Sequence, residues 1–281
     1  MLRFLLSMFS RLPLFILYGF ARLIYFALSY VIQYRKQVIE TNLSNSFPNV
    51  DAKTLRQYKM GFYKYLSEIF VETIKAYSIS DAELRRRCYV SPDSLVISQI
   101  KNEPTSVIML SCHVGNWEWV GMSIGLQFRP RPVHIVYLNL AKNDDVMKGI
   151  RERTGNKLIF MQMVYRHLIE DATSRPISCL AADQTPQRHK IGTWIPFLNQ
   201  DTPFFTGPGK MARKLNLPVY FAYAHRVSLG KYELRFEKLF AAGQAKTDEE
   251  IMTRYAQKLE QIIHESPSQW LWSHKRWKHK R

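Results

Sequence analysis

The chain has 281 residues, of which 46% are hydrophobic, and this is enough for a large folded core, so a disordered or disulfide-stapled chain is excluded. Its 40 Lys and Arg against 23 Asp and Glu give a net charge of +17, which exceeds what solubility requires and indicates an anionic partner: nucleic acid, anionic lipid or an acidic protein. Its three cysteines form no C-x-x-C pair, so neither a disulfide framework nor a zinc ribbon is expected and a reducing compartment is the simplest interpretation.

The first predicted element is an apolar N-terminal helix. Residues 12–32 are apolar except for Arg22 and small or tyrosyl positions, and the stretch is close to the ~20 residues that cross a bilayer. Three interpretations compete: a signal peptide cleaved at 27–29 (ALS), a single span, or a helix lying in the membrane interface. In the last two, the basic remainder of the chain faces the cytoplasm. We therefore expect a membrane-anchoring or interfacial helix over residues 1–35 and one catalytic-type domain over residues 36–281.

Beyond this segment, strand patterns alternate with helix patterns. A helix is predicted over residues 51–77, capped by Asp51, because apolar residues recur there at three- and four-residue steps. Strands are then predicted at 105–110, 132–139, 176–183 and 217–226, and helices at 116–128, 143–155, 163–173, 207–216 and 247–267. This alternation predicts an α/β fold with a mostly parallel central sheet flanked by helices. Residues 231–240 alternate polar and apolar side chains, which is typical of an edge or antiparallel strand.

The stretch SCHVGNWEW (111–119) carries the residues suited to chemistry. Four residues separate His113 from Glu118, so on a continuous helix their side chains would not meet. They meet if His113 ends the strand and the helix begins near Asn116, with Gly115 permitting the sharp turn. His113 then lies at the carboxyl edge of a parallel strand, where open α/β sheets bind ligands. Glu118 would orient one imidazole nitrogen and leave the other free as a base.

No protein nucleophile accompanies this pair. Cys112 would point to the opposite side of an extended segment from His113, and Ser111 has poor geometry for proton transfer to a histidine two residues away. The remaining mechanism is a base that deprotonates a hydroxyl of the substrate, whose oxygen then attacks an activated acyl group. A purely structural histidine is the alternative.

A strand followed by His, four residues and an acid resembles the motif of the glycerolipid acyltransferases. SCHVGNWEW in particular resembles a block of the late lipid A acyltransferases of Gram-negative bacteria. Further stretches resemble blocks of the same family in the same order, namely YRKQVIETNLSNSFP, RERTGNKLI, AADQTPQ, PFLNQDTPFFTGPGKMARKLNLPV and SPSQWLWSHKRWK. The resemblance therefore covers essentially the whole chain.

The resemblance implies an acyltransferase of the inner membrane, with its catalytic domain on the cytoplasmic side. The enzyme would move a fatty acyl group from acyl carrier protein to a hydroxyl of a lipid A precursor, without metal or cofactor. His113 would be the general base and Glu118 its orienting acid. Arg151, with Arg153 as the alternative, and Asp183 would bind substrate or support the site. Asp183 ends an apolar run, as a site carboxylate should, and the arginine would pair with it or with a substrate phosphate.

The ending WLWSHKRWKHKR combines tryptophans with basic residues, which predicts contact with an anionic membrane surface. Stacking on RNA is the alternative, but the chain has no recognisable nucleic-acid module, so no nucleic-acid partner is expected. An acidic carrier protein and an anionic glycolipid would account for the positive charge. Two other functions stay open: acyl transfer to another lipid acceptor, and a non-enzymatic basic protein that binds anionic lipid or RNA.

Overall fold

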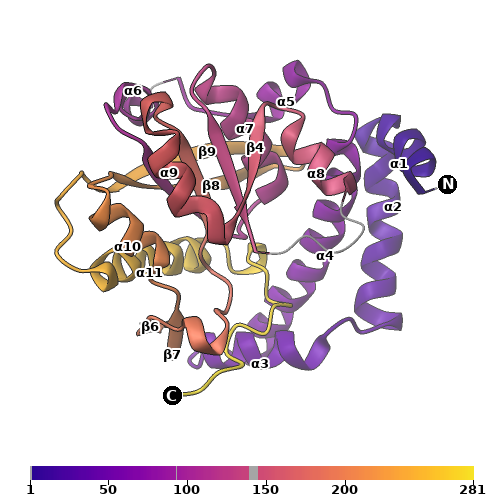
Figure 1. Ribbon diagram of the computed structural model, residues 1–281. Coiled ribbons are helices and arrows are strands. Elements are labelled where there is room, and N and C mark those ends of the chain that lie inside the picture. The colour runs from indigo at the N-terminus through magenta and orange to yellow at the C-terminus, as the bar shows by residue number, and fades with distance from the viewer. Residues whose placement is uncertain (1, 93, 139–144) are drawn as a thin grey trace.

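The computed structural model describes residues 2–92, 94–138 and 145–281. Its centre is a seven-stranded sheet in the order β1-β9-β8-β2-β5-β3-β4, flanked by helices (Figure 1). Strands β8, β2, β5, β3 and β4 are mutually parallel, β9 runs antiparallel to β8, and β1 is parallel to β9. The strands are β1 Cys88–Tyr89, β2 Val107–Ser111, β3 Val133–Tyr137, β4 Asn156–Phe160, β5 Ile177–Ala181, β8 Val219–Ser228 and β9 Lys231–Phe240. The predicted mostly parallel α/β fold is thus confirmed, as is the antiparallel strand at 231–240.

The helices Ala52–Ala76 and Asp248–Glu265 begin at side-chain caps. The Asp51 side chain accepts a hydrogen bond from the Thr54 amide at 3.0 Å, and the Thr247 hydroxyl accepts one from the Glu250 amide at 3.0 Å. The α-helices are α1 Leu2–Arg11, α2 Leu14–Phe26, α3 Lys36–Ser46, α4 Ala52–Ala76, α5 Asp81–Arg87, α6 Leu95–Asn102, α7 Trp117–Phe128, α8 Asp145–Glu152, α9 Val164–Glu170, α10 Gly207–Lys214 and α11 Asp248–Glu265. The predicted helices are confirmed within a few residues. The first two residues of the predicted helix 143–155, and the last of the predicted strand 132–139, lie outside the described residues.

The sequence-based prediction misses the helices α3, α5 and α6, the two-residue strand β1 and two further features of the fold. One is the sheet-edge strand β4, and the other is an antiparallel hairpin of β6, Thr193–Phe197, with β7, Gln200–Phe204. The hairpin turn places Leu198 and Asn199 at φ 52° and 59°, as a two-residue turn of this kind requires. Leucine is rare at positive φ. Because Leu198 and Asn199 occupy the turn, the sequence lacks the glycine or Asx-Gly signal that usually marks a hairpin.

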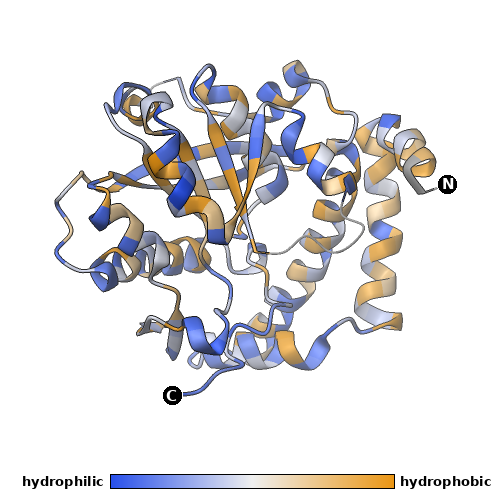
Figure 2. Ribbon diagram, viewed as in Figure 1, coloured by the Kyte–Doolittle hydropathy of each residue, from blue (hydrophilic) through white to orange (hydrophobic). Residues whose placement is uncertain are grey.

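Helix α2 is apolar on both sides. Leu14 and Leu17 are buried against α4, whereas Phe15 and Leu23 on the other side are 76% and 67% exposed. Figure 2 shows α2 at the edge of the molecule, largely in hydrophobic colours. The 18 residues Leu14–Val31 form a helix long and apolar enough to cross a membrane. The helix therefore combines a face packed on the protein with an exposed apolar face of the kind that membrane contact requires.

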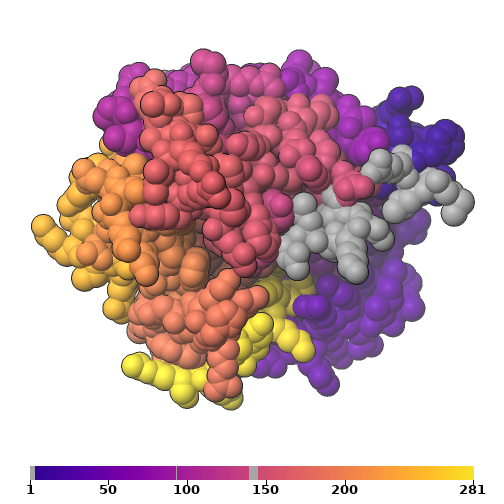
Figure 3. Space-filling view, in the orientation of Figure 1, coloured from indigo at the N-terminus to yellow at the C-terminus, as the bar shows by residue number. Residues whose placement is uncertain are grey.

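Several side chains of the C-terminal segment are packed into the protein. Trp270, Trp272 and Arg276 are 2%, 0% and 0% exposed. The Arg276 guanidinium donates to the carbonyl of Pro203 at 2.8 Å. Figure 3 shows part of the yellow C-terminal segment between the orange segment of β6 and β7 and the purple N-terminal helices, with the end of the chain below the orange segment. The prediction that this ending faces a membrane surface is wrong for these three residues. An aromatic and basic composition does not determine which side chains turn inward, and indole rings gain more from burial than from exposure.

Candidate active site

His113 and Asp183 meet at the carboxyl edge of the sheet. Strands β2 and β5 are parallel neighbours with Ser111 opposite Ala181, and His113 and Asp183 each follow two residues later. The Nδ1 atom of His113 lies 2.7 Å from Oδ1 of Asp183, and the amide of His113 donates to Oδ2 at 2.8 Å. Asp183 therefore orients the imidazole through Nδ1 and also holds the backbone amide of His113.

Glu118 has a different partner from the one predicted. It lies in the first turn of α7 and accepts two hydrogen bonds from the Arg151 guanidinium of α8, at 2.9 Å from Nε and 2.6 Å from Nη2. The predicted pairing of His113 with Glu118, and of the arginine with Asp183, is therefore wrong. Asp183 binds His113, and Glu118 binds Arg151, which is the reverse of the predicted pairing. Glu118 projects from α7 toward α8, where the planar guanidinium of Arg151 can donate two parallel hydrogen bonds to a carboxylate.

The two candidate arginines, Arg151 in α8 and Arg153 just after it, point to different places. Arg151 lines the cavity beside His113. Arg153 points elsewhere, because its guanidinium donates to the carbonyl of Ala76 at 3.4 Å and lies 4.0 Å from the carboxylate of Asp81. Arg151 is thus the arginine that the structure places at the site.

The turn between β2 and α7 has the geometry that the sequence predicts. Gly115 has φ +69°, and the Asn116 side chain accepts a hydrogen bond from the Trp119 amide at 3.0 Å. Tyrosine hydroxyls hold the turn from both ends, since Tyr255 donates to the carbonyl of Ser111 at 2.7 Å and Tyr65 donates to that of Gly115. The turn is therefore held by hydrogen bonds from the core beneath it.

We expect Gly115→Ala to destabilise the protein by about 2 kcal/mol or more, from backbone strain and overpacking. A Cβ atom at Gly115 would lie 2.5 Å from the carbonyl oxygen of Ala224, and positive φ disfavours any side chain. Urea denaturation measures the loss. The matched control is Gly149→Ala in α8, where a Cβ atom meets nothing within 4 Å and helix propensity should raise stability by up to ~1 kcal/mol. Equal stability of the two variants would contradict the prediction.

The surroundings of His113 and Asp183 shift both pKa values. Burial disfavours the protonated imidazole, but the charge and hydrogen bond of Asp183 outweigh it, so the pKa of His113 lies above its ordinary value. Burial opposes the carboxylate of Asp183, but the charge of His113 and hydrogen bonds from His113 and the Trp270 indole lower its pKa to about 2. Asp183 is thus ionised, and the Nδ1–H of His113 donates to it. The other ring nitrogen, Nε2, carries the lone pair of a base.

The thiol of Cys112, next to His113, is unsuited to act as a nucleophile. Burial, and next the charge of Asp183, raise the pKa of the Cys112 thiol well above its ordinary value, so the thiolate is disfavoured. The Nε2 atom of His113 lies 3.3 Å from the side-chain amide nitrogen of Gln184, which donates to it in this tautomer. The base is therefore arranged to serve a group that enters from outside.

A cavity of about 300 Å³ opens beside this base. His113, Glu118, Arg151 and Gln184 form its polar end. Its remaining walls are mostly apolar and include Val120, Gly121 and Ile124 of α7 and Ile135 and Val136 of β3. Such a site can hold a hydrocarbon chain with its reactive end at the imidazole.

Two residues of the site were absent from the sequence-based prediction. Gln184 directly follows Asp183 in the AADQ stretch, so its position next to a strand-end carboxylate was a usable signal. The indole of Trp270 donates to Oδ2 of Asp183 at 2.9 Å, but Trp270 lies far along the chain and no local pattern connects the two residues.

An α/β sheet with a carboxylate-bound imidazole at its carboxyl edge, beside a largely apolar cavity, is an arrangement suited to base catalysis on an apolar substrate. The model of the bacterial lipid A biosynthesis acyltransferase family matches residues 2–279, and the chain belongs to this family. None of the curated proteins compared with the chain matches it.

Proposed function

We propose that the protein transfers a fatty acyl group from the thioester of acyl carrier protein to a hydroxyl of a lipid A precursor, at the cytoplasmic side of the bacterial inner membrane. One observation carries this proposal within the family. His113 is bound to Asp183 through Nδ1 at 2.7 Å and lines, with its ring, a largely apolar cavity of about 300 Å³. A base at the polar end of an apolar cavity suits a hydroxyl acceptor and a fatty thioester.

In the proposed mechanism, Nε2 of His113 takes the proton of the acceptor hydroxyl, which replaces the Gln184 amide at that nitrogen. The hydroxyl oxygen attacks the thioester carbonyl and forms a tetrahedral intermediate. As this intermediate collapses, the carbon–sulfur bond breaks, and the imidazolium returns the proton to the leaving thiolate. Asp183 stabilises the imidazolium between the two steps.

The ion pair of Glu118 with Arg151 has a supporting role in this proposal. It joins α7 to α8 beside the cavity through two hydrogen bonds, with Glu118 only 7% exposed. In the first turn of α7, the Trp119 amide is bound by the Asn116 side chain, and the amides of Trp117 and Glu118 have no acceptor within the helix. They would stabilise the oxyanion of the intermediate.

The same proposal assigns residues 1–35 to membrane attachment and residues 36–281 to catalysis. The exposed apolar side of α2 supports membrane attachment, and its packed side keeps the catalytic domain next to the lipid surface. A retained helix is favoured over a cleaved signal peptide, since cleavage would expose the apolar surface of α4 on which Leu14 and Leu17 pack.

Mass spectrometry tests the proposed function. The purified protein in detergent, given acyl carrier protein loaded with a fatty acid and a lipid A precursor, should add the mass of one acyl chain to that precursor. Lipid A from cells lacking the protein should correspondingly lack one chain. Unchanged lipid A together with acylation of another lipid would assign a different acceptor. Salt-sensitive binding of polyanions without acyl transfer would indicate a binding protein instead.

Ionic strength should distinguish the contribution of the acidic carrier protein to donor binding from that of the acyl group it carries. With a net charge of +17, the protein should attract an acidic carrier, and salt screens this attraction. Between 50 and 500 mM salt we expect the KM for the acylated carrier to rise about five- to tenfold, with kcat changing less than about twofold. The matched control is the acyl-pantetheine thioester, which lacks the acidic protein and should show an almost constant KM. Equal salt responses of the two donors would mean that the charge serves the membrane alone.

A further inference from the structure

A buried carboxylate lies behind the active site. Glu72 of α4 is 0% exposed. Its Oε1 atom accepts a hydrogen bond from the Tyr18 hydroxyl at 2.7 Å, and its Oε2 atom accepts two, from the Asn116 amide at 2.7 Å and from the Tyr232 hydroxyl at 2.7 Å. The donors come from α2, from the N-cap of α7 and from β9. One carboxylate thus binds three separate parts of the fold.

Packing alone does not explain this arrangement. Burial of a carboxylate costs free energy and raises the pKa of Glu72, against the hydrogen bonds from Tyr232, Tyr18 and Asn116 and the charge of Arg226. An apolar side chain of similar size would fill the space without that cost. What a carboxylate with three donors adds is direction, because its hydrogen bonds fix the relative positions of the groups that it joins.

On one side, this carboxylate holds the active-site turn. The Asn116 side chain caps α7 through Oδ1 and donates to Glu72 through Nδ2. Helix α4 also grips the turn by two further hydrogen bonds: the Trp119 indole donates to the carbonyl of Glu72 at 3.1 Å, and Tyr65 donates to Gly115. Asn116 lies between the base His113 and Glu118 of the ion pair, so a shift of this cap moves both.

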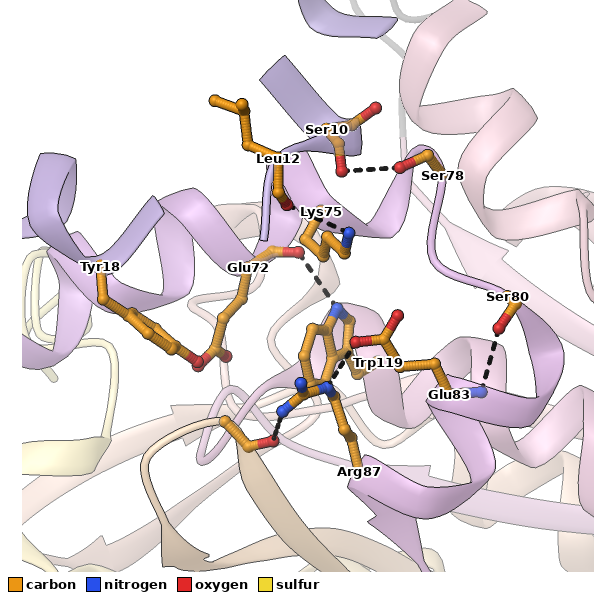
Figure 4. A network of polar contacts seen from close by, with 11 residues as sticks. Ser10, Leu12, Tyr18, Glu72, Lys75, Ser78, Ser80, Glu83, Arg87 and Trp119 are labelled. Carbon is orange, nitrogen blue, oxygen red and sulfur yellow. Dashed lines mark hydrogen bonds and ion pairs between the residues drawn. The ribbon is translucent and has the colours of Figure 1, made fainter. Parts of the chain in front are cut away.

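On the other side, the carboxylate holds the apolar N-terminal helices. Figure 4 shows the Tyr18 hydroxyl of α2 directed at the Glu72 carboxylate, with the Trp119 indole at the backbone of the same residue. One turn further along α4, Lys75 donates to the carbonyl of Leu12 at 3.2 Å. Helix α2 is thus fastened to α4 at the level of the active-site turn.

We propose that Glu72 is a positioning residue that joins α2 to the turn carrying His113, so that the packing of α2 against α4 controls the rate of acyl transfer. The rate part of this inference rests on the proposed function. The helix then does more than attach the enzyme to lipid, because loosening it misaligns the base. A misplacement of a catalytic group by about 1 Å can cost about 100-fold in rate.

Tyr18→Phe tests the connection between α2 and Glu72, since it removes only the hydroxyl that donates a hydrogen bond to Glu72. We expect kcat to fall about three- to tenfold, with the KM for the acylated carrier unchanged within about twofold. The matched control is Tyr63→Phe. It removes a hydroxyl of α4 that donates to the carbonyl of Tyr34 at 2.9 Å, another bond between α4 and the N-terminal segment that does not involve Glu72. Its kcat should stay at the wild-type value. An equal loss in both variants would mean that general loosening, not Glu72, is responsible.

A double-mutant cycle follows the link to the turn. Asn116→Ser keeps a good N-cap for α7 but loses the amide that donates to Glu72. In the Asn116→Ser background, Tyr18→Phe should lower kcat less than about 1.5-fold further, because the connection is already cut. Independent, multiplicative losses would overturn the inference.

Amide hydrogen exchange provides a readout that does not need activity. Tyr18→Phe should speed exchange in residues 114–119 at least about threefold, whereas Tyr63→Phe should not. Unchanged exchange in Tyr18→Phe would overturn the link whatever the enzyme does. If wild-type protein transfers no acyl group, the proposed function fails and the rate part of the inference falls with it, while faster exchange would still support the structural link.

Discussion

Replacing His113 with alanine should abolish measurable acyl transfer, with kcat falling about 10²- to 10⁴-fold, the range that general base catalysis contributes. Because Asp183 binds Nδ1 at 2.7 Å, the lone pair that can take a proton is on Nε2 of the imidazole, which faces Gln184. The KM for the acylated carrier should change little, since in the proposed mechanism His113 takes a proton from the acceptor and does not bind the donor.

Steady-state transfer assays on His113→Ala and on a matched histidine variant measure this effect. His264→Ala on α11 is the control, because His264 is exposed and does not line the cavity. Both variants should retain the thermal midpoint of the wild type within a few degrees. Turnover within about tenfold of the wild-type rate in His113→Ala would rule out general base catalysis by this residue.

Replacing Asp183 with asparagine should lower kcat about 10²- to 10⁴-fold and move the pH profile. In the Ser-His-Asp triad, the corresponding loss of the orienting carboxylate costs about 10⁴-fold, because the imidazole takes the wrong tautomer. The base acts when neutral, so the wild-type rate should rise with pH through the pKa of His113, which Asp183 holds above its ordinary value. Without that carboxylate, burial lowers the pKa of His113, and the acid limb should move to lower pH.

Glu118→Gln distinguishes Asp183 from the carboxylate that the sequence favoured. Glu118 also raises the pKa of His113 by its charge, but less than Asp183 does, so its removal should move the acid limb by a smaller amount. Its main effect should be the loss of the bidentate pair with Arg151. Measured pH profiles of kcat for both variants decide between the two carboxylates. A larger shift in Glu118→Gln than in Asp183→Asn would assign the orienting role to Glu118.

Local patterns predicted the elements that carry the site. The strand before His113, the positive φ of Gly115 and the cap by Asn116 all appear as expected, because each depends on residues only a few positions apart. The long helices α4 and α11 and their caps follow from the same kind of signal. The hairpin of β6 and β7 was missed, since its turn residues Leu198 and Asn199 lack the usual glycine signal. Strand β4 was missed although Gly155, at φ 89°, marks the turn before it.

What the sequence by itself determined is the α/β class, the strand-to-helix turn and the identity of His113 as a candidate base. Only the tertiary structure decided which carboxylate His113 binds, because β5 lies beside β2 in the sheet although β3 and β4 intervene in the chain. The burial of Trp270 against Asp183 and the junction at Glu72 depend in the same way on segments far apart in sequence. Local patterns fix what a segment becomes, whereas strand order and packing decide which side chains meet.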